Sequence, residues 1–358
     1  MTRKKLSGNQ LLDFVGTDEI APIWIGLDVH KKSYYVALRR ADGVCKSWVS
    51  PADPGVLSRQ FSTISKRISL IVYEAGPTGY SLERLLKTNG YPVAIIAPSR
   101  IPRPATKQAK TDKLDCLKLA EYAAKGMIEA ITTPTEQESA ERNVLRRRYQ
   151  LVDSTRKTKQ RIKSFLLFHG IDDEVIVRTW NRAAQERLSK LTLHSDLKFV
   201  LKSLLRELKY EEAELARITS RLTRITKRKH HFEVVKNLKT VPGVGDIVAS
   251  AFRMELFRPD RFRCAEEVCS YLGLAPAIRQ SGEKRRSGWL MRSGQARLRS
   301  LLIEAAWMWR AKDPWARSKY QFHLSRCGTA QKSITALARR LAVILWRLSV
   351  ENRAYVIR

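Results

Sequence analysis

Short runs of β-forming residues fill the start of the chain, and their order restricts the fold more than any other feature. Trp24–Val29 is apolar, and Tyr34–Arg39 is rich in β-forming residues. Ala41-Asp42-Gly43 is a turn signal that leads into Val44–Val49. Runs of this length, separated by turn residues, predict three strands joined by hairpins.

Helical and β-rich patterns then alternate. The next expected elements are a helix over Pro54–Arg67, a strand over Ser69–Tyr73, a helix over Tyr80–Asn89, a strand over Pro92–Ile96, and a helix from Asp112 to about Gly126 that Thr111 caps. Three hairpin strands followed by αβαβα are the order of the RNase H-like fold. The sequence therefore predicts an α/β N-terminal domain of this class.

The rest of the chain has a helical pattern. We expect a flexible N-terminal arm over 1–22, a catalytic domain over 23–130, a helical or coiled-coil segment over 131–233 and a mainly α C-terminal domain over 234–358. Between residues 197 and 225 the apolar positions recur in steps of three and four, which favours a coiled coil or a long helical hairpin. A plain amphipathic helix on a globular core is the alternative.

The charge of the chain points to a polyanionic partner. Lys and Arg number 67 against 35 Asp and Glu, a net charge of +32, and the excess is spread along the whole sequence. Nucleic acid is favoured over an anionic membrane or a merely basic protein, because phosphate neutralisation would supply the affinity. None of the 5 cysteines is spaced as CxxC, so a reducing cytoplasm is expected. Neither a signal peptide nor a membrane span is expected.

Four acidic residues are the candidate catalytic and metal-binding residues. Asp28 lies within an apolar strand, where a carboxylate is costly unless it is paired or binds a cation. Glu74 ends a strand that neighbours the first in an RNase H-like sheet, and Asp112 and Asp115 share one face of a helix. Taken singly, each acid could be an ordinary surface or capping residue. Taken together they predict a site for Mg²⁺ or Mn²⁺, since two such ions can stabilise the attacking and leaving oxygens at phosphorus.

Two C-terminal features are candidates for nucleic-acid contact. Gly243 and Gly245 lie in VPGVG, which resembles the helix-hairpin-helix motif, although the turn could serve packing alone. The segment 278–300 is strongly basic and holds three serines that precede glycine, Ser281, Ser287 and Ser293. A solvated basic loop that grips DNA is the alternative. The predicted nucleic-acid-binding cations are Arg279, Lys284, Arg285, Arg286, Arg292 and Arg297.

These stretches in this order resemble the DEDD-type insertion-sequence transposases. The resemblance covers residues 23–126 and about 238–302, and extends loosely to Tyr355. It rests on IGLDVHKKS, VYEAGPTGYSL, KTDKLDCLKLAEY, LKTVPGVG, YLGLAP and RQSGEKRRSGWLMRSGQARLR. Relatives often read Ser-Ser-Gly where this chain has Gln280-Ser281-Gly282.

The resemblance implies more than the pattern does. It implies a RuvC-like N-terminal domain whose DEDD tetrad is Asp28, Glu74, Asp112 and Asp115. It also implies a DNA recombinase guided by a structured bridge RNA that pairs with target and donor DNA, working as a homodimer or homotetramer, with Ser281 as nucleophile. A RuvC-like nuclease that uses metal-activated water, or a non-catalytic nucleic-acid-binding protein, are the competing hypotheses.

Overall fold

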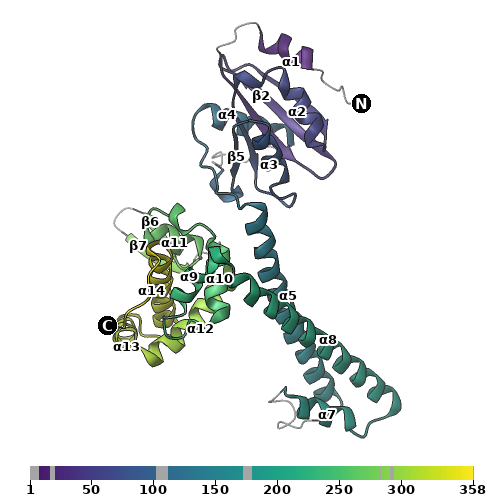
Figure 1. Ribbon diagram of the computed structural model, residues 1–358, viewed down its shortest axis with the longest axis vertical. Helices are drawn as coiled ribbons and strands as arrows, with labels where there is room; N and C mark the ends of the chain where they lie inside the picture. The colour runs from purple at the N-terminus through teal and green to yellow at the C-terminus, as the bar shows by residue number, and fades with distance from the viewer. Residues whose placement is uncertain are drawn as a thin grey trace. The chain divides into compact units, whose positions relative to one another are not determined.

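The protein forms two compact units, residues 1–133 and 134–358, which are described separately (Figure 1). This computed structural model describes residues 8–16, 21–101, 112–171, 180–281, 284–290 and 294–357. In the described residues, no helix combines the length and the hydrophobicity needed to cross a membrane. The first unit is α/β and the second is mainly helical, as the predicted fold class requires. The four-part domain division stays a prediction.

A five-stranded sheet is the centre of the first unit. Its strands are β1 (Ile23–Val29), β2 (Ser33–Arg40), β3 (Cys45–Pro51), β4 (Ile68–Glu74) and β5 (Val93–Ile96). The strand order is β3-β2-β1-β4-β5, with β1 to β3 antiparallel and β4 and β5 parallel to β1. All five strands were predicted, with bounds shifted by only one or two residues.

Helices cover both faces of this sheet (Figure 1). α1 (Gly8–Val15), α2 (Pro54–Ser62) and α3 (Ser81–Thr88) supply buried side chains to one core, in which Ile25 and Leu27 of β1 also lie. α4 (Asp112–Ala124) packs on the opposite face through Leu119 and Ala123. The sheet is therefore the middle of three layers. Asp112 and Asp115 lie in the first turn of α4, on the face of the sheet that this helix covers.

The expectation of a flexible arm over 1–22 is wrong for residues 8–15. Leu11 and Val15 of α1 are buried in the core, so the helix is an integral part of the first unit. The helix was missed because α1 is only 8 residues long, which is too short for its apolar positions to define a period. The expected helix over Pro54–Arg67 is also shorter, since α2 ends at Ser62 and a short 3₁₀ turn follows.

A long helical hairpin begins the second unit. α5 (Glu136–Phe168) starts at a capping box of Thr135 and Glu138, and α8 (Ser195–Thr226) packs along it, with α7 (Arg182–Lys190) at the far end (Figure 1). Ile162 and Leu166 of α5 share a core with leucines of α8. The apolar repeat over 197–225 thus lies in one helix of a hairpin, one of the predicted alternatives.

The remaining helices enclose a second core. They are α9 (Lys229–Leu238), α10 (Asp246–Leu256), α11 (Ala265–Tyr271), α12 (Ala296–Lys312), α13 (Pro314–Cys327) and α14 (Ala330–Glu351). Trp309 and Phe252 are fully buried in this core, and Leu145 of α5 also belongs to it. The strands β6 (Pro276–Ser281) and β7 (Lys284–Leu290) form an antiparallel hairpin in a part of the chain for which the sequence predicted no strand.

Candidate metal centre

Asp28 lies near the end of β1, on the face of the sheet that α4 covers. Successive strand residues point to opposite faces, so Asp28 faces the same side as Gly26. Gly26 lies directly beneath α4: a Cβ atom built there would be 2.1 Å from the carbonyl oxygen of Cys116. A glycine in β1 therefore allows the helix to approach the strand closely enough for its acids to reach Asp28.

The first turn of α4 supplies Asp112 and Asp115. Two acids in this position are favoured by the unpaired N–H groups at the start of a helix. Cys116 follows them, is buried against β2 and donates its thiol to the carbonyl oxygen of Tyr35 at 3.2 Å. This contact and the close approach at Gly26 fix the start of the helix over the sheet.

His30 joins the cluster, and sequence reasoning missed it. Its Nε2 lies 3.1 Å from Oδ2 of Asp28 and 3.4 Å from Oδ2 of Asp112. One ligand atom from each of these three residues lies within 4.8 Å of the other two, which is compact enough for a shared metal ion. The signal was available in the sequence, because His30 is only two positions after Asp28 at the end of the same strand.

The electrostatics of the cluster favour a bound cation. Burial raises the pKa of Asp28, the His30 imidazole lowers it, and the negative charges of Asp112 and Asp115 raise it further, so that the pKa ends above its ordinary value. Carboxylates that repel one another in this way are stabilised when a cation lies between them. The charge on Asp115 thus acts on Asp28 although Asp115 is outside the compact set of three.

Glu74 lies on the strand next to Asp28. Leu27 of β1 pairs with Tyr73 of β4, and Glu74 is the next residue along. Its side chain is exposed. Continued by one residue, this parallel register places Asp28 beside Glu74, with both side chains on the same face of the sheet, as the sequence predicted. Of the four predicted acids, the structure brings Asp28 and Asp112 into direct proximity, with Asp115 and Glu74 at the margin.

The ligand set fits a hard divalent cation. Carboxylate oxygens are the donors that Mg²⁺ and Mn²⁺ prefer, and an imidazole nitrogen is accepted better by Mn²⁺ than by Mg²⁺. Asp28 and Asp112 are partly exposed, with side-chain exposures of 27% and 46%, so a ligand can approach them from solvent. These residues can hold a metal against which a phosphate oxygen would bind.

A second group of possible ligands, Glu141, His230 and His231, is better explained as a structural cluster. Arg228 donates to Glu141 at 2.7 Å, and Arg253 donates to Nδ1 of His231 at 3.2 Å. The other ring nitrogen of His231 therefore carries the proton and donates it to Glu141 at 2.8 Å. Two guanidinium groups and a protonated ring nitrogen make this cluster unsuitable for a cation.

Of the serines and basic residues predicted in the C-terminal part, the structure describes the side chain of Arg297 alone. Ser281 ends β6, but its side chain and those of Arg279, Lys284, Arg285, Arg286 and Ser287 lie outside what the structure describes, as do Arg292 and Ser293 entirely. Arg297, on α12, is half exposed and pairs with Asp153 of α5 at 2.9 Å. Its contact with nucleic acid stays a prediction.

The glycine turn joins α9 to α10 as predicted, but its two glycines differ. A Cβ atom at Gly243 would be 2.7 Å from the carbonyl oxygen of Ala305, and its φ is +88°. Gly245 precedes α10 and has open space around its Cα. Gly243 thus has a packing role against α12, whereas Gly245 leaves its surroundings open to a ligand.

Two family models match separate stretches of the chain. Residues 25–170 match a family model described as a transposase, of the DEDD type found in IS110 elements, and residues 235–321 match the model of the transposase IS116/IS110/IS902 family. The chain is similar to the "Putative transposase y4qE" of Sinorhizobium fredii, at 27% identity over 92% of this chain and 89% of the relative. It is also similar to the transposase for insertion sequence element IS1533 of Leptospira borgpetersenii, at 28% identity over 80% and 85%.

The α/β unit with its acidic cluster, the basic helical unit and these matches together define a DNA transposase. The chain belongs to the IS110 family of DEDD-type insertion-sequence transposases.

Proposed function

We propose that this transposase cuts and rejoins DNA with a metal site formed by Asp28, Glu74, Asp112 and Asp115 in a RuvC-like, RNase H-like domain. The observation that carries the proposal is the convergence of Asp28 and Asp112 on His30, directly above the close contact of α4 with Gly26. Membership of a DEDD family implies a divalent metal, and the donor set fits Mg²⁺ or Mn²⁺.

Each residue of the cluster has a separate role in this proposal. Asp28 and Asp112 hold the ion, while Asp115 and Glu74 complete its ligand set from the helix and the neighbouring strand. His30 orients Asp28 by donating its Nε2–H to the carboxylate at 3.1 Å, and its other ring nitrogen, Nδ1, can take up a proton as the reaction proceeds. A bound divalent cation would polarise the phosphate and stabilise the charge that develops on its oxygens.

The finer parts of the proposal concern the C-terminal unit. Ser281 is proposed as the nucleophile, activated by the metal site of a facing subunit, and Ser287 and Ser293 are the reserve candidates. Arg285 or Arg286 would neutralise the charge on phosphorus. A covalent step would keep the energy of the broken phosphodiester for rejoining, as a recombinase requires.

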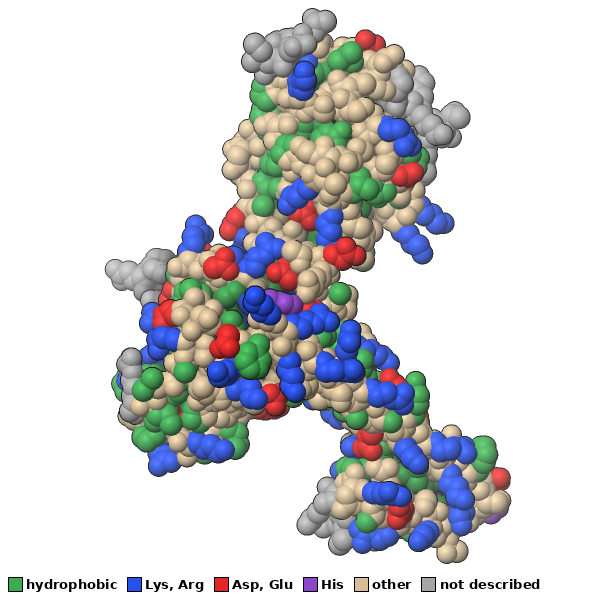
Figure 2. Space-filling model, in the orientation of Figure 1, with side chains coloured by type: hydrophobic (Ala, Val, Ile, Leu, Met, Phe, Trp, Pro, Cys, Tyr) green, Lys and Arg blue, Asp and Glu red, His purple; other side chains and the backbone are tan. Residues whose placement is uncertain are grey.

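A structured guide RNA, together with target and donor DNA, is proposed as the partner set of a homodimer or homotetramer. The net charge of +32 supports polyanion binding. Lys and Arg side chains are also prominent on the face of the α5–α8 hairpin seen in Figure 2. Sequencing of the nucleic acid that co-purifies with the protein tests this part, and recovery of only random cellular RNA would contradict RNA guidance.

The metal site is tested by Asp28→Ala. We expect loss of Mg²⁺-dependent plasmid cleavage and recombination with nucleic-acid binding retained, because the substitution removes a central ligand while the basic surfaces remain. Asp42→Ala is the control, since Asp42 is an exposed acid of the same unit that pairs with Arg40. Near-normal activity of the Asp28 variant would remove the basis of the metal-site proposal.

The serine is tested by trapping. On a nicked substrate the wild-type protein is expected to form a protein–DNA adduct on a denaturing gel, and Ser281→Ala is expected to lack it. An adduct that persists in this variant would move the role to Ser287 or Ser293. Normal cleavage without an adduct in any variant would favour hydrolysis by activated water.

A further inference from the structure

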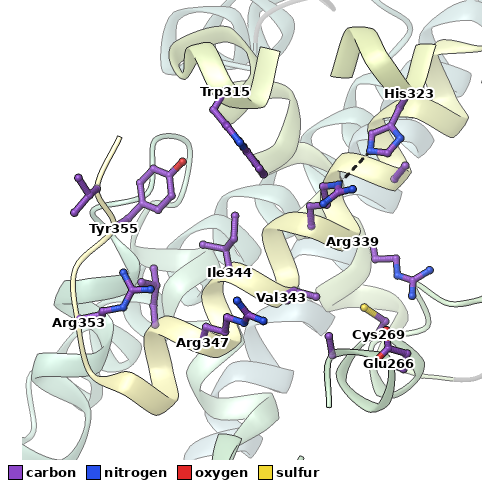
Figure 3. Close-up of a pocket in the computed structure, with 15 residues that line it drawn as sticks. Glu266, Cys269, Trp315, His323, Arg339, Val343, Ile344, Arg347, Arg353 and Tyr355 are labelled. Atoms are coloured by element: carbon purple, nitrogen blue, oxygen red, sulfur yellow. Dashed lines mark hydrogen bonds between the residues drawn. The ribbon is translucent and has the colours of Figure 1, made fainter. Parts of the chain in front are cut away.

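A cavity of about 800 Å³ opens in the second unit, among α11, α13, α14 and the chain that follows α14 (Figure 3). Its volume falls in the range of small-ligand sites, about 300–1,000 Å³. No residue of the proposed metal site or of the glycine turn lines it. The cavity therefore calls for a separate functional explanation.

Cationic side chains dominate the polar part of this cavity. Arg339, Arg340, Arg347 and Arg353 line it, whereas Glu266 is the single acid among its described lining residues. Burial lowers the pKa of His323, and the positive charges of Arg340, Lys319 and Arg326 lower it further. The cavity is thus a region of positive potential that favours an anionic ligand.

Planar and apolar side chains form the other part. In Figure 3 the rings of Trp315 and Tyr355 lie near Ile344, with Arg347 and Arg353 on the side below. The ring centre of Trp315 is 5.6 Å from that of buried Trp309, and Tyr355 donates its hydroxyl to Asp313 at 2.8 Å. These contacts hold both rings in place before any ligand binds, which lowers the entropic cost of binding.

Arg347 is the cation most available to a ligand. It is exposed on α14, and in the described part of the chain it has neither a hydrogen bond nor an ion pair. By contrast, Arg353 pairs with Glu351, and Arg340 donates to His323 at 3.4 Å. Because Arg347 lines the cavity and has no such partner among the described residues, its guanidinium can pair with an anion that enters the cavity.

We propose that this cavity binds one unpaired nucleotide of a single strand, with the base against Trp315 and Tyr355 and the phosphate on Arg347. Aromatic side chains stack on any base, and arginine next to them contacts the backbone phosphate, which is the usual chemistry of single-strand recognition. The choice of a nucleotide over other aromatic anions rests on the proposed function, in which the protein binds a guide RNA and DNA. The cavity would hold a base displaced from a duplex or a loop while the acidic cluster acts elsewhere.

The first test compares Arg347→Gln with Lys332→Gln by fluorescence anisotropy. Lys332 is an exposed lysine of the same helix that does not line the cavity, so its variant removes the same charge. The probes are fluorescein-labelled oligothymidylate and oligouridylate of about ten nucleotides, and a hairpin duplex without unpaired bases. We expect Arg347→Gln to weaken single-strand binding about tenfold and to reduce its log–log salt slope by about 0.7, with Lys332→Gln changing the affinity less than about twofold.

The two probes distinguish DNA from RNA as the source of the nucleotide. A larger loss with oligouridylate assigns the cavity to the RNA strand, and a larger loss with oligothymidylate assigns it to DNA. Equal losses for the two variants on the single strands, or an equal loss for the duplex and the single strands in Arg347→Gln, would overturn the proposal.

A second measurement uses the unmodified protein and so does not depend on how any variant folds. Oligonucleotides that carry 5-iodouracil are irradiated in the complex, and the cross-linked peptide is identified by mass spectrometry. We expect attachment at Trp315 or Tyr355, and cross-links found solely outside the cavity would contradict the proposal. Neither experiment contains Mg²⁺ or measures cleavage, so failure of the metal-site proposal would leave their results unchanged.

Discussion

Replacing Gly26 with alanine tests whether the contact of α4 with β1 creates the acidic cluster. The added Cβ would lie 2.1 Å from the carbonyl oxygen of Cys116 and 2.8 Å from the amide nitrogen of Ala120. Normal contacts of this kind begin near 3.4 Å, so α4 would have to move by roughly 1.3 Å. The obstructing atoms are backbone, so a change of rotamer cannot relieve the clash.

The expected cost has two measurable parts. Overpacking a core usually costs about 1–3 kcal/mol, and a backbone clash belongs at the upper end, so the free energy of unfolding should fall by about 3 kcal/mol. For a unit of this size the melting temperature should fall by roughly 10 °C. A displacement of about 1 Å in a catalytic group also costs about 100-fold in rate, so cleavage should be nearly lost even where the protein is folded.

Calorimetry and Mg²⁺-dependent plasmid cleavage measure these two effects in parallel. Gly76→Ala is the matched control for stability, because its Cβ would meet only the carbonyl oxygen of Glu74, at an ordinary 3.9 Å. A Gly26→Ala protein with the melting temperature and cleavage rate of the wild type would refute the argument. Loss of stability with full cleavage would instead show that the acids do not depend on the position of α4.

The remaining predictions concern the second unit. Its free energy of unfolding should decrease as the pH falls below about 6.5, because burial lowers the pKa of His231 and the unfolded chain then takes up a proton that the folded state resists. Urea titrations across this range should show a flatter pH dependence for His231→Gln, and an unchanged slope would exclude His231 as the cause. Gly243→Ala should cost about 2 kcal/mol or more in urea unfolding, because of its positive φ and the carbonyl oxygen of Ala305, whereas Gly245→Ala should stay within about 0.5 kcal/mol. Equal effects at the two glycines would show that packing does not distinguish them.

The strands of the first unit could be predicted because each is a short apolar run between turn residues. The strand over Trp24–Val29 is one residue longer in the structure, and Val44–Val49 is shifted by one or two. Helix α1 could not be recognised in the same way, since two buried residues, Leu11 and Val15, are too few to define a period. The hairpin of β6 and β7 was missed for a related reason, because Lys284–Leu290 is rich in arginine and has no apolar alternation.

The candidate site was predictable to the extent that it depends on strand and helix positions. Asp28 and Asp112 were expected to meet, and the order of strands together with the face of α4 brings them together. The spacing of two between Asp28 and His30 indicates that both can lie on one side, but the contact of His30 with Asp112 depends on a side-chain direction that neither a periodic pattern nor composition specifies. The closeness of the approach depends on Gly26, whose role appears only when the helix above it is known.

Helix α5 belongs to two hydrophobic cores at once, through Leu145 at one end and Ile162 and Leu166 at the other. This sharing limits how the hairpin can change in length during evolution. One inserted residue would rotate everything beyond it by about 100° and turn one set of apolar side chains to solvent. Insertions of about seven residues, matched in α8, preserve both faces and lengthen the hairpin by about 10 Å. Related transposases should therefore differ in reach by whole heptads, paired between the two helices.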